Sequence, residues 1–164
     1  MERSIGFKER RYIEELRILT RSTAVDCIID ERFDRVIYVI KPGDMGLAIG
    51  KKGENIKRLA RSLGRRLEMV EYGETPEVFI ANIIRPAELD GLAPAAEEGT
   101  VDLVLRHRAD LGIVIGRGGC TIEKVRLLSR RFYGLEVDDV RIAEPEEAED
   151  AGEAGAEVKV PRDD

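Results

Sequence analysis

The sequence predicts an α+β protein that contains two copies of one small unit. Two stretches align without gaps at an offset of 66 residues, so that Gly50 and Gly53 of the first fall on Gly116 and Gly119 of the second. The other identical pairs are Asp44 and Asp110, Gly46 and Gly112, Ile49 and Ile115, Ile56 and Ile122, and Arg65 and Arg131. Identities at a fixed offset indicate an internal repeat. We therefore expect one domain in residues 1–74, a second in residues 75–143, and an acidic tail in residues 144–164.

The first copy alternates between helical and strand-like patterns. Apolar residues recur every three or four positions in its helical segments and every second position in its strands. The expected elements are a helix over 8–21, strands near 25–30 and 36–40, a short helix ending at Ile49, a helix between Gly53 and Gly64, and a strand over 66–72. We expect Asp44 to cap the short helix of this copy and Asp110 to cap its equivalent in the second, since Asp is a favoured N-cap residue.

The second copy predicts the same order of elements. The expected elements are a helix over 77–84, a strand within 87–97, a strand over 101–107, a short helix after Asp110, a helix ended by Gly134, and a strand over 135–142. The strand within 87–97 is the least regular, because Gly91 and Pro94 interrupt its pattern. Gly46 and Gly112 are expected to be packing positions that allow close helix approach.

The net charge of −6 is concentrated in the tail. Residues 144–164 hold nine acidic and two basic residues, which leaves 25 basic and 24 acidic residues in the body. Within the body, residues 41–70 and 103–131 each carry a net charge of +5. The acidic tail is expected to be disordered, since it is too polar to bury a core. The overall acidity therefore does not argue against a nucleic-acid partner.

Composition also narrows the class of protein. The chain has no apolar run long enough for a membrane span and no signal-peptide core, so we expect a cytoplasmic protein without a membrane partner. Cys27 and Cys120 lack the spacing of a zinc site, and we expect no metal and no cofactor. The absence of Gln and the high charge content suggest a thermophilic source, although base bias towards Arg is an alternative.

The glycine-containing loops are the segments best suited to bind a ligand. A helix N-terminus offers backbone N–H groups and a positive dipole end to an anion. Glycines let the backbone turn sharply and approach a ligand closely. The residues between the glycines are basic, Lys51 and Lys52 in the first loop and Arg117 in the second. Such a loop favours binding of a phosphodiester backbone.

The two loops carry the resemblance to a known family. Residues 49–56 and 115–122 each resemble the I-G-x-x-G-x-x-I signature of KH domains, whose loop clamps about four single-stranded nucleotides. The helix-first order is similar to the prokaryotic, type II arrangement, in which helices cover a three-stranded sheet. Two such domains in tandem resemble the KH region of the NusA family of transcription factors. The longer bacterial members carry further domains for which this chain has no room.

The resemblance implies a groove on each domain, between the loop with its helices and an edge strand. It implies that the chain binds single-stranded RNA as a monomer, without enzymatic activity, in transcription elongation, termination or antitermination. RNA polymerase or ribosomal proteins are the further partners expected if the chain acts as a scaffold. The expected RNA-binding residues are Ile49, Gly50, Lys51, Lys52, Gly53, Ile56, Lys57, Ile115, Gly116, Arg117, Gly118, Gly119, Ile122 and Lys124.

Other interpretations stay open on the sequence alone. The loops fail the Walker and dinucleotide patterns at Met45 and Thr121, and a catalytic pair of Cys120 with His107 is a minor alternative. KH folds can also serve as protein-interaction scaffolds that do not contact RNA. A further alternative concerns the outer arginines, which form either a solvated or ion-paired helix face or an RNA-binding surface: Arg58, Arg61, Arg65, Arg66, Arg126, Arg130 and Arg131.

Overall fold

A computed structural model of the chain describes residues 3–145 and has the expected α+β architecture. The first copy contains α1 (Phe7–Thr20), β1 (Ala24–Asp30), β2 (Arg35–Ile40), α2 (Met45–Ile49), α3 (Glu54–Leu63) and β3 (Leu67–Glu71). The second contains α4 (Pro76–Ile83), β4 (Leu89–Pro94), β5 (Thr100–Leu105), α5 (Leu111–Ile115), α6 (Cys120–Tyr133) and β6 (Glu136–Ile142). Short 3-10 turns at Lys51–Gly53, Arg108–Asp110 and Arg117–Gly119 are the elements that the sequence patterns did not predict.

Each copy forms its own three-stranded sheet with the same topology. β2 pairs antiparallel with β1 and parallel with β3, and β5 pairs in the same way with β4 and β6. The parallel strand follows a helix crossover in both cases, as parallel pairing requires. The expected tail from residue 146 onward lies outside the described residues, and the domain boundary after residue 74 stays a prediction.

The central strand β2 contributes to two hydrophobic cores. All six of its residues are buried. Val36, Tyr38 and Ile40 pack with α1 and α3, whereas Ile37 and Val39 pack on the opposite face with α4 and α6. Alternate residues of a strand point to opposite faces, so a continuous apolar run predicts a strand covered on both sides.

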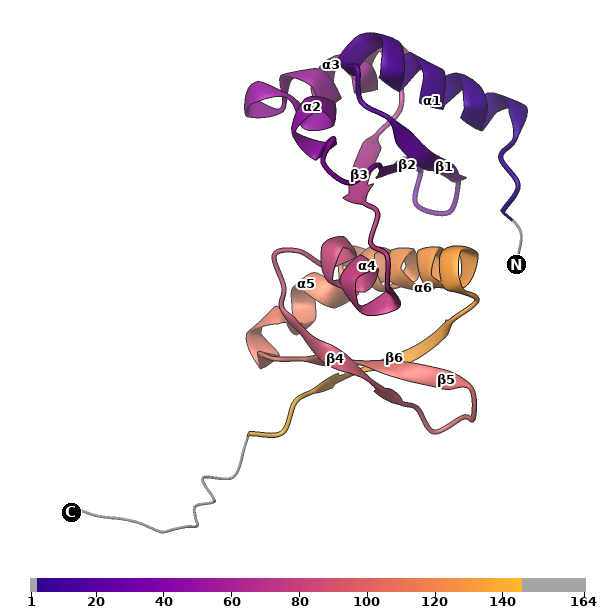
Figure 1. The fold of residues 1–164 in the computed structure, drawn as a ribbon. Helices are drawn as coiled ribbons and strands as arrows, with labels where there is room; N and C mark the ends of the chain where they lie inside the picture. The colour runs from indigo at the N-terminus through magenta and orange to yellow at the C-terminus, as the bar shows by residue number, and fades with distance from the viewer. Residues whose placement is uncertain (1–2, 146–164) are drawn as a thin grey trace, which may run out of the picture.

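The molecule is therefore a stack of four layers (Figure 1). Helices α1, α2 and α3 lie on one sheet, and α4, α5 and α6 lie between that sheet and the second one. One continuous core joins residues of both copies, including Val70 of β3, Phe79 of α4 and Leu128 of α6. A domain of about 60 residues buries little surface alone, and this shared core offsets that deficit.

Polar contacts fix the docking of the second copy on the first. Asp26 in β1 is buried, and its carboxylate accepts hydrogen bonds of 2.6 and 3.0 Å from Arg131 of α6. Arg35, 1% exposed, donates to the carbonyl of Cys120 at 2.9 Å and pairs with Asp30 at 2.7 Å. Paired charges tolerate burial, whereas a single buried charge would be strongly destabilising.

Two predictions about local structure are wrong. Asp44 and Asp110 precede α2 and α5, but neither side chain caps its helix. The Asp44 carboxylate instead accepts from the backbone N–H of Thr23 at 2.8 Å, and the Asp110 carboxylate accepts from that of Glu88 at 3.0 Å. These acids thus hold the start of each short helix against the chain that precedes the first strand of the same copy.

The glycines at 46 and 112 are not packing positions. A Cβ atom built on either one meets nothing within 4 Å, because both residues lie on exposed faces of α2 and α5. Close helix approach therefore does not require glycine there.

Within residues 3–145 every helix is too short or too polar to cross a bilayer.

Candidate nucleic-acid interface

The two glycine loops have the same backbone conformation. Gly50 and Gly116 lie at φ/ψ of 77°/170° and 78°/167°, and the third residues, Lys52 and Gly118, at 58°/25° and 64°/15°. In each loop the last glycine donates its N–H to the carbonyl of the first at 3.1 Å. Two segments 66 residues apart therefore build one and the same turn.

The first glycine of each loop is required by close packing as well as by its positive φ. A Cβ on Gly50 would lie 2.8 Å from the backbone nitrogen of Asn55, and one on Gly116 would lie 2.7 Å from that of Thr121. No side chain fits at that distance, so the loop closes tightly onto the helix that follows. Asn55 adds to this closure, since its amide donates to the carbonyl of Leu47 at 2.7 Å.

Lys52 occupies a left-handed conformation that is unfavourable for a residue with a side chain. Its φ is +58°, and the second copy has Gly118 at the equivalent position. A left-handed backbone costs a non-glycine residue roughly 1–2 kcal/mol. Strained positions of this kind cluster at functional sites. Lys52 is exposed, so packing against the protein does not explain its presence.

A groove of about 500 Å³ runs between α2 and the edge strand β3. Met45 and Ile49 of α2 form one wall and Glu68–Glu71 of β3 the other, which is the groove position that the resemblance implies. The groove continues onto the second copy through α4 and Lys124 of α6. Half of its lining residues are apolar, and unstacked bases can contact such side chains and the strand backbone beside them.

Lys124 was predicted as an RNA-binding residue, and it lies in this first groove rather than in one of its own copy. Its ammonium group donates to Glu68 at 2.7 Å, and its side chain is 13% exposed. Burial raises the pKa of Glu68, but the hydrogen bond from Lys124 and the nearby Lys124, Arg35 and Arg66 charges outweigh it, so the pKa is lowered overall. The ion pair with Glu68 therefore largely neutralises the charge of Lys124 within the protein.

The other predicted residues divide into exposed and packed groups. Lys51, Lys52, Lys57, Arg117 and Gly118 are exposed. Ile49 lines the groove, and Ile115 packs against the main core. Ile122 is a core residue at 5% exposure, which leaves it little surface for a ligand. The partly buried remainder consists of Gly50, Gly53, Ile56, Gly116 and Gly119.

Five of the seven outer arginines form ion pairs, as a structural helix face would. Arg65 pairs with Glu31 and Asp34, and the remaining four pair with one acid each: Arg66 with Glu68, Arg126 with Glu123, Arg130 with Glu136, and Arg131 with Asp26. Arg58 and Arg61 have no ion-pair partner within the described part of the chain. Both outer arginines without an ion pair in residues 3–145 thus belong to the first copy.

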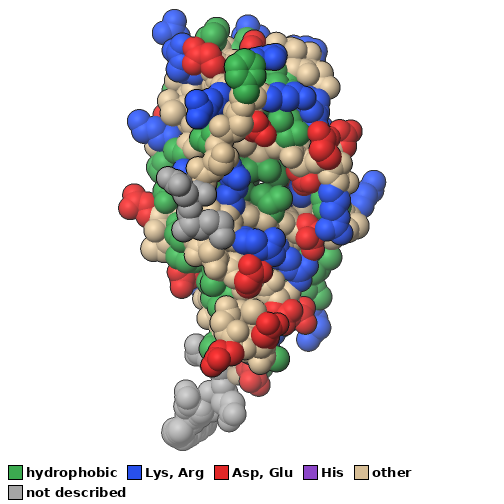
Figure 2. Space-filling view, turned by 90° about the vertical axis from the view of Figure 1, so that its right-hand side faces the viewer, with side chains coloured by type: hydrophobic (Ala, Val, Ile, Leu, Met, Phe, Trp, Pro, Cys, Tyr) green, Lys and Arg blue, Asp and Glu red, His purple; other side chains and the backbone are tan. Residues whose placement is uncertain are grey.

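The face turned away from α2 and α5 has a different character. Figure 2 shows Lys and Arg side chains interspersed with Asp and Glu over most of this face. Interspersed charges produce no large field of one sign. This face therefore offers no extended basic surface to a polyanion.

Sequence reasoning missed eight of the ten groove-lining residues because they lie outside the repeated signature. Asn82 donates to the carbonyl of Glu71 at 3.0 Å, and Arg85 donates to Asn82 at 2.9 Å. Both line the groove, together with Met45. The one sequence feature that could have pointed to Asn82 is the rarity of asparagine, since the chain has only Asn55 and Asn82. In the structure both side chains donate to backbone carbonyls beside the predicted site.

The alternative Cys–His pair has other contacts. His107 lies 3.4 Å from Glu88, and the Cys120 thiol lies 3.9 Å from the Thr121 hydroxyl. The other cysteine, Cys27, is buried. Burial raises the pKa of its thiol to about 12, which keeps the thiol protonated and poorly nucleophilic. Within residues 3–145 no group of His, Cys, Asp and Glu is arranged to hold a metal ion.

Known proteins resemble this chain in sequence over most of its length. Residues 9–89 match the KH domain family. The chain is 35% identical over 133 residues to the "Probable transcription termination protein NusA" of Halococcus morrhuae, covering 81% of this chain and 93% of the relative. The protein of the same name from Methanococcus vannielii is 38% identical over 71% of this chain and 67% of its own.

A solved structure has the same overall fold. The crystal structure of APE1850 superposes with a TM-score of 0.72 at 32% sequence identity. The match covers 85% of this chain and the whole of that one.

Proposed function

The chain belongs to the NusA-like family of KH-domain proteins, and from that premise we propose that it binds single-stranded RNA during transcription. KH loops clamp the backbone of about four nucleotides. We infer that Gly50–Gly53 and Gly116–Gly119 act in this way, with Lys51, Lys52 and Arg117 attracting phosphates. The relatives are named as termination proteins, and we propose a corresponding role in termination or antitermination beside RNA polymerase.

The observation that supports this proposal most directly is the duplication of the loop conformation. Both loops have matching φ/ψ values, and the short helices that lead into them lie on the same side of the molecule (Figure 1). A turn needed only for packing would not have to repeat an exposed basic residue after its first glycine, Lys51 in the first loop and Arg117 in the second. A ligand with a repeating backbone meets two equivalent clamps.

The contacts between the copies favour one continuous path. The first groove extends to Lys124 of α6. Helix α6 begins at Cys120, directly after the second loop, and the carbonyl of Cys120 accepts a hydrogen bond from Arg35 of the first copy. Two clamps mounted on one rigid core would hold about eight nucleotides if each takes about four. Rigid linkage also raises overall affinity, because the second clamp binds at a high effective concentration.

The test replaces the cations of the first loop. The double variant Lys51→Asp with Lys52→Asp should bind labelled single-stranded RNA at least tenfold more weakly at moderate salt. The control variant Lys8→Asp with Arg11→Asp makes the same charge change on exposed positions of α1 and should have a much smaller effect. Equal losses in the two variants, or no loss in the folded loop variant, would remove the first loop from the RNA site.

A titration of single-stranded RNA and duplex DNA side by side separates RNA binding from a scaffold role. We expect RNA to bind more tightly and its affinity to fall as salt rises, because phosphate contacts release counterions. If neither nucleic acid binds, the protein is better described as a scaffold for polymerase or ribosomal proteins.

A further inference from the structure

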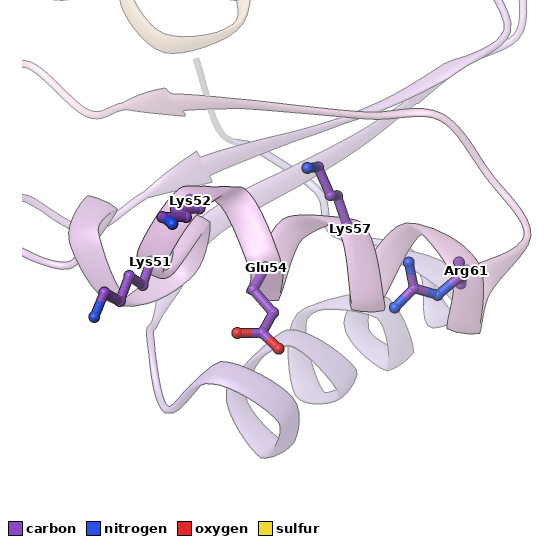
Figure 3. A pocket seen from close by; sticks show the side chains of 5 residues that line it. All are labelled: Lys51, Lys52, Glu54, Lys57 and Arg61. Atoms are coloured by element: carbon purple, nitrogen blue, oxygen red, sulfur yellow. The ribbon is translucent and has the colours of Figure 1, made fainter.

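An open basic hollow lies on α3, outside the groove between α2 and β3. Its volume is about 440 Å³, and its lining residues are Lys51, Lys52, Glu54, Lys57 and Arg61. Figure 3 shows the two lysines on the loop and the other three side chains spaced along α3. The lining consists of four cations and one carboxylate, and all five residues are exposed. We call this hollow the α3 trough.

The cations of the α3 trough have no partner within residues 3–145. None of the four forms an ion pair with a described carboxylate, in contrast to most basic residues of α6. Lys57 and Arg61 are four residues apart on one helix, a spacing at which like charges repel and destabilise the helix. The fold thus carries an unfavourable arrangement that an anion would relieve.

The second copy shows that the fold itself does not require a basic face here. The residues equivalent to Lys57 and Arg61 are Glu123 and Leu127. Leu127 packs against the main core, and Glu123 pairs with Arg32 at 3.2 Å. In α6 this face therefore docks the two copies together, whereas in α3 the same face is uncovered and basic.

We propose that the α3 trough binds the phosphodiester backbone of RNA that flanks the nucleotides held in the first groove. This inference rests on the proposed function. Lys51 and Lys52 belong both to the clamping loop and to the trough, so a strand leaving the clamp has its next phosphates beside α3. Lys57 and Arg61 are about 6 Å apart along the helix axis, which lets each contact a separate phosphate.

The experiment compares a short and a long RNA on the full chain. The short probe is a labelled single strand of about eight nucleotides, the length that two clamps hold, and the long probe extends it by about eight nucleotides at each end. The test variant is Lys57→Gln with Arg61→Gln, and glutamine keeps the helix propensity. The matched control is Arg58→Gln with Arg11→Gln, which removes two exposed cations outside the trough.

We expect the test variant to lose several-fold less affinity for the short probe than for the long probe. On the long probe it should lose tenfold or more in affinity at low salt. The slope of log affinity against log salt should fall by about 1.4, since each single-strand phosphate contact contributes about 0.7. The control variant should keep most of that slope.

Three outcomes would overturn the proposal. The first is an equal loss on both probes, and the second is an equal loss of slope in the control variant. The third is tighter binding of the long probe by the test variant, which would indicate that the trough holds an acidic segment of the chain that competes with RNA. The short probe keeps its sensitivity to Lys51→Asp with Lys52→Asp in all three, so the proposed function is tested independently.

Discussion

Replacing Lys52 by glycine should move stability and RNA affinity in opposite directions. The residue sits at φ +58°, where a side chain costs about 1–2 kcal/mol. Glycine removes that cost but adds about 0.5–1 kcal/mol of chain entropy in the unfolded state. The difference predicts a gain of up to about 1.5 kcal/mol in the free energy of unfolding. Loss of the ammonium group should weaken RNA binding and reduce the salt slope by about 0.7.

The assay pairs urea unfolding with fluorescence anisotropy on labelled single-stranded RNA. The second copy supplies the reverse experiment, because Gly118 has nearly the same dihedral angles. Gly118→Lys should destabilise the protein by a similar amount and strengthen RNA binding. A less stable Lys52→Gly variant would refute the strain argument, and unchanged RNA affinity would refute the reason given for keeping lysine there.

Three further perturbations test other parts of the molecule. Arg131→Ala should lower the free energy of unfolding by about 3 kcal/mol, because it leaves the buried Asp26 carboxylate short of a partner. The control Arg130→Ala removes a neighbouring exposed ion pair and should lower it by less than about 1 kcal/mol. Equal losses in urea unfolding would contradict the burial argument. Gly46→Ala should raise stability by up to about 1 kcal/mol, since its Cβ meets open space in a helix, and a lower thermal midpoint would show that the position is packed. Deleting residues 144–164 should tighten RNA binding at low salt if the acidic tail competes for the basic loops, and an unchanged affinity would dismiss that competition.

The order of elements could be predicted because the repeat supplied each pattern twice. The helix of the second copy ends at Gly134 as the first ends at Gly64, and both glycines adopt the left-handed cap conformation. The irregular strand β4 was located correctly despite Gly91 and Pro94. Turn geometry and helix periodicity are local properties, and local sequence is sufficient to specify them.

Contacts between distant segments could not be predicted in the same way. Lys124 is a basic residue close to the second loop in sequence, which is typical of an RNA-binding residue. Its hydrogen-bond partner Glu68, however, is 56 residues away and on the other copy. Asp44 has the position of a helix cap, but a backbone N–H 21 residues earlier binds its carboxylate. The residue type determines which hydrogen bonds and ion pairs a side chain can form. Which of them do form depends on the segments that the complete fold brings together.

The sharing of β2 between two cores has a consequence for how the chain can be divided. A fragment ending after β3 would present Ile37 and Val39 to water, and the complementary fragment would lose the surface on which Phe79 and Leu128 pack. Neither half is therefore an autonomous folding unit, and heat or denaturant should melt both in a single cooperative step. Because residues of both copies share one core, we expect the two clamps to keep a set separation, so that an RNA spanning both should tolerate few changes in the number of nucleotides between them.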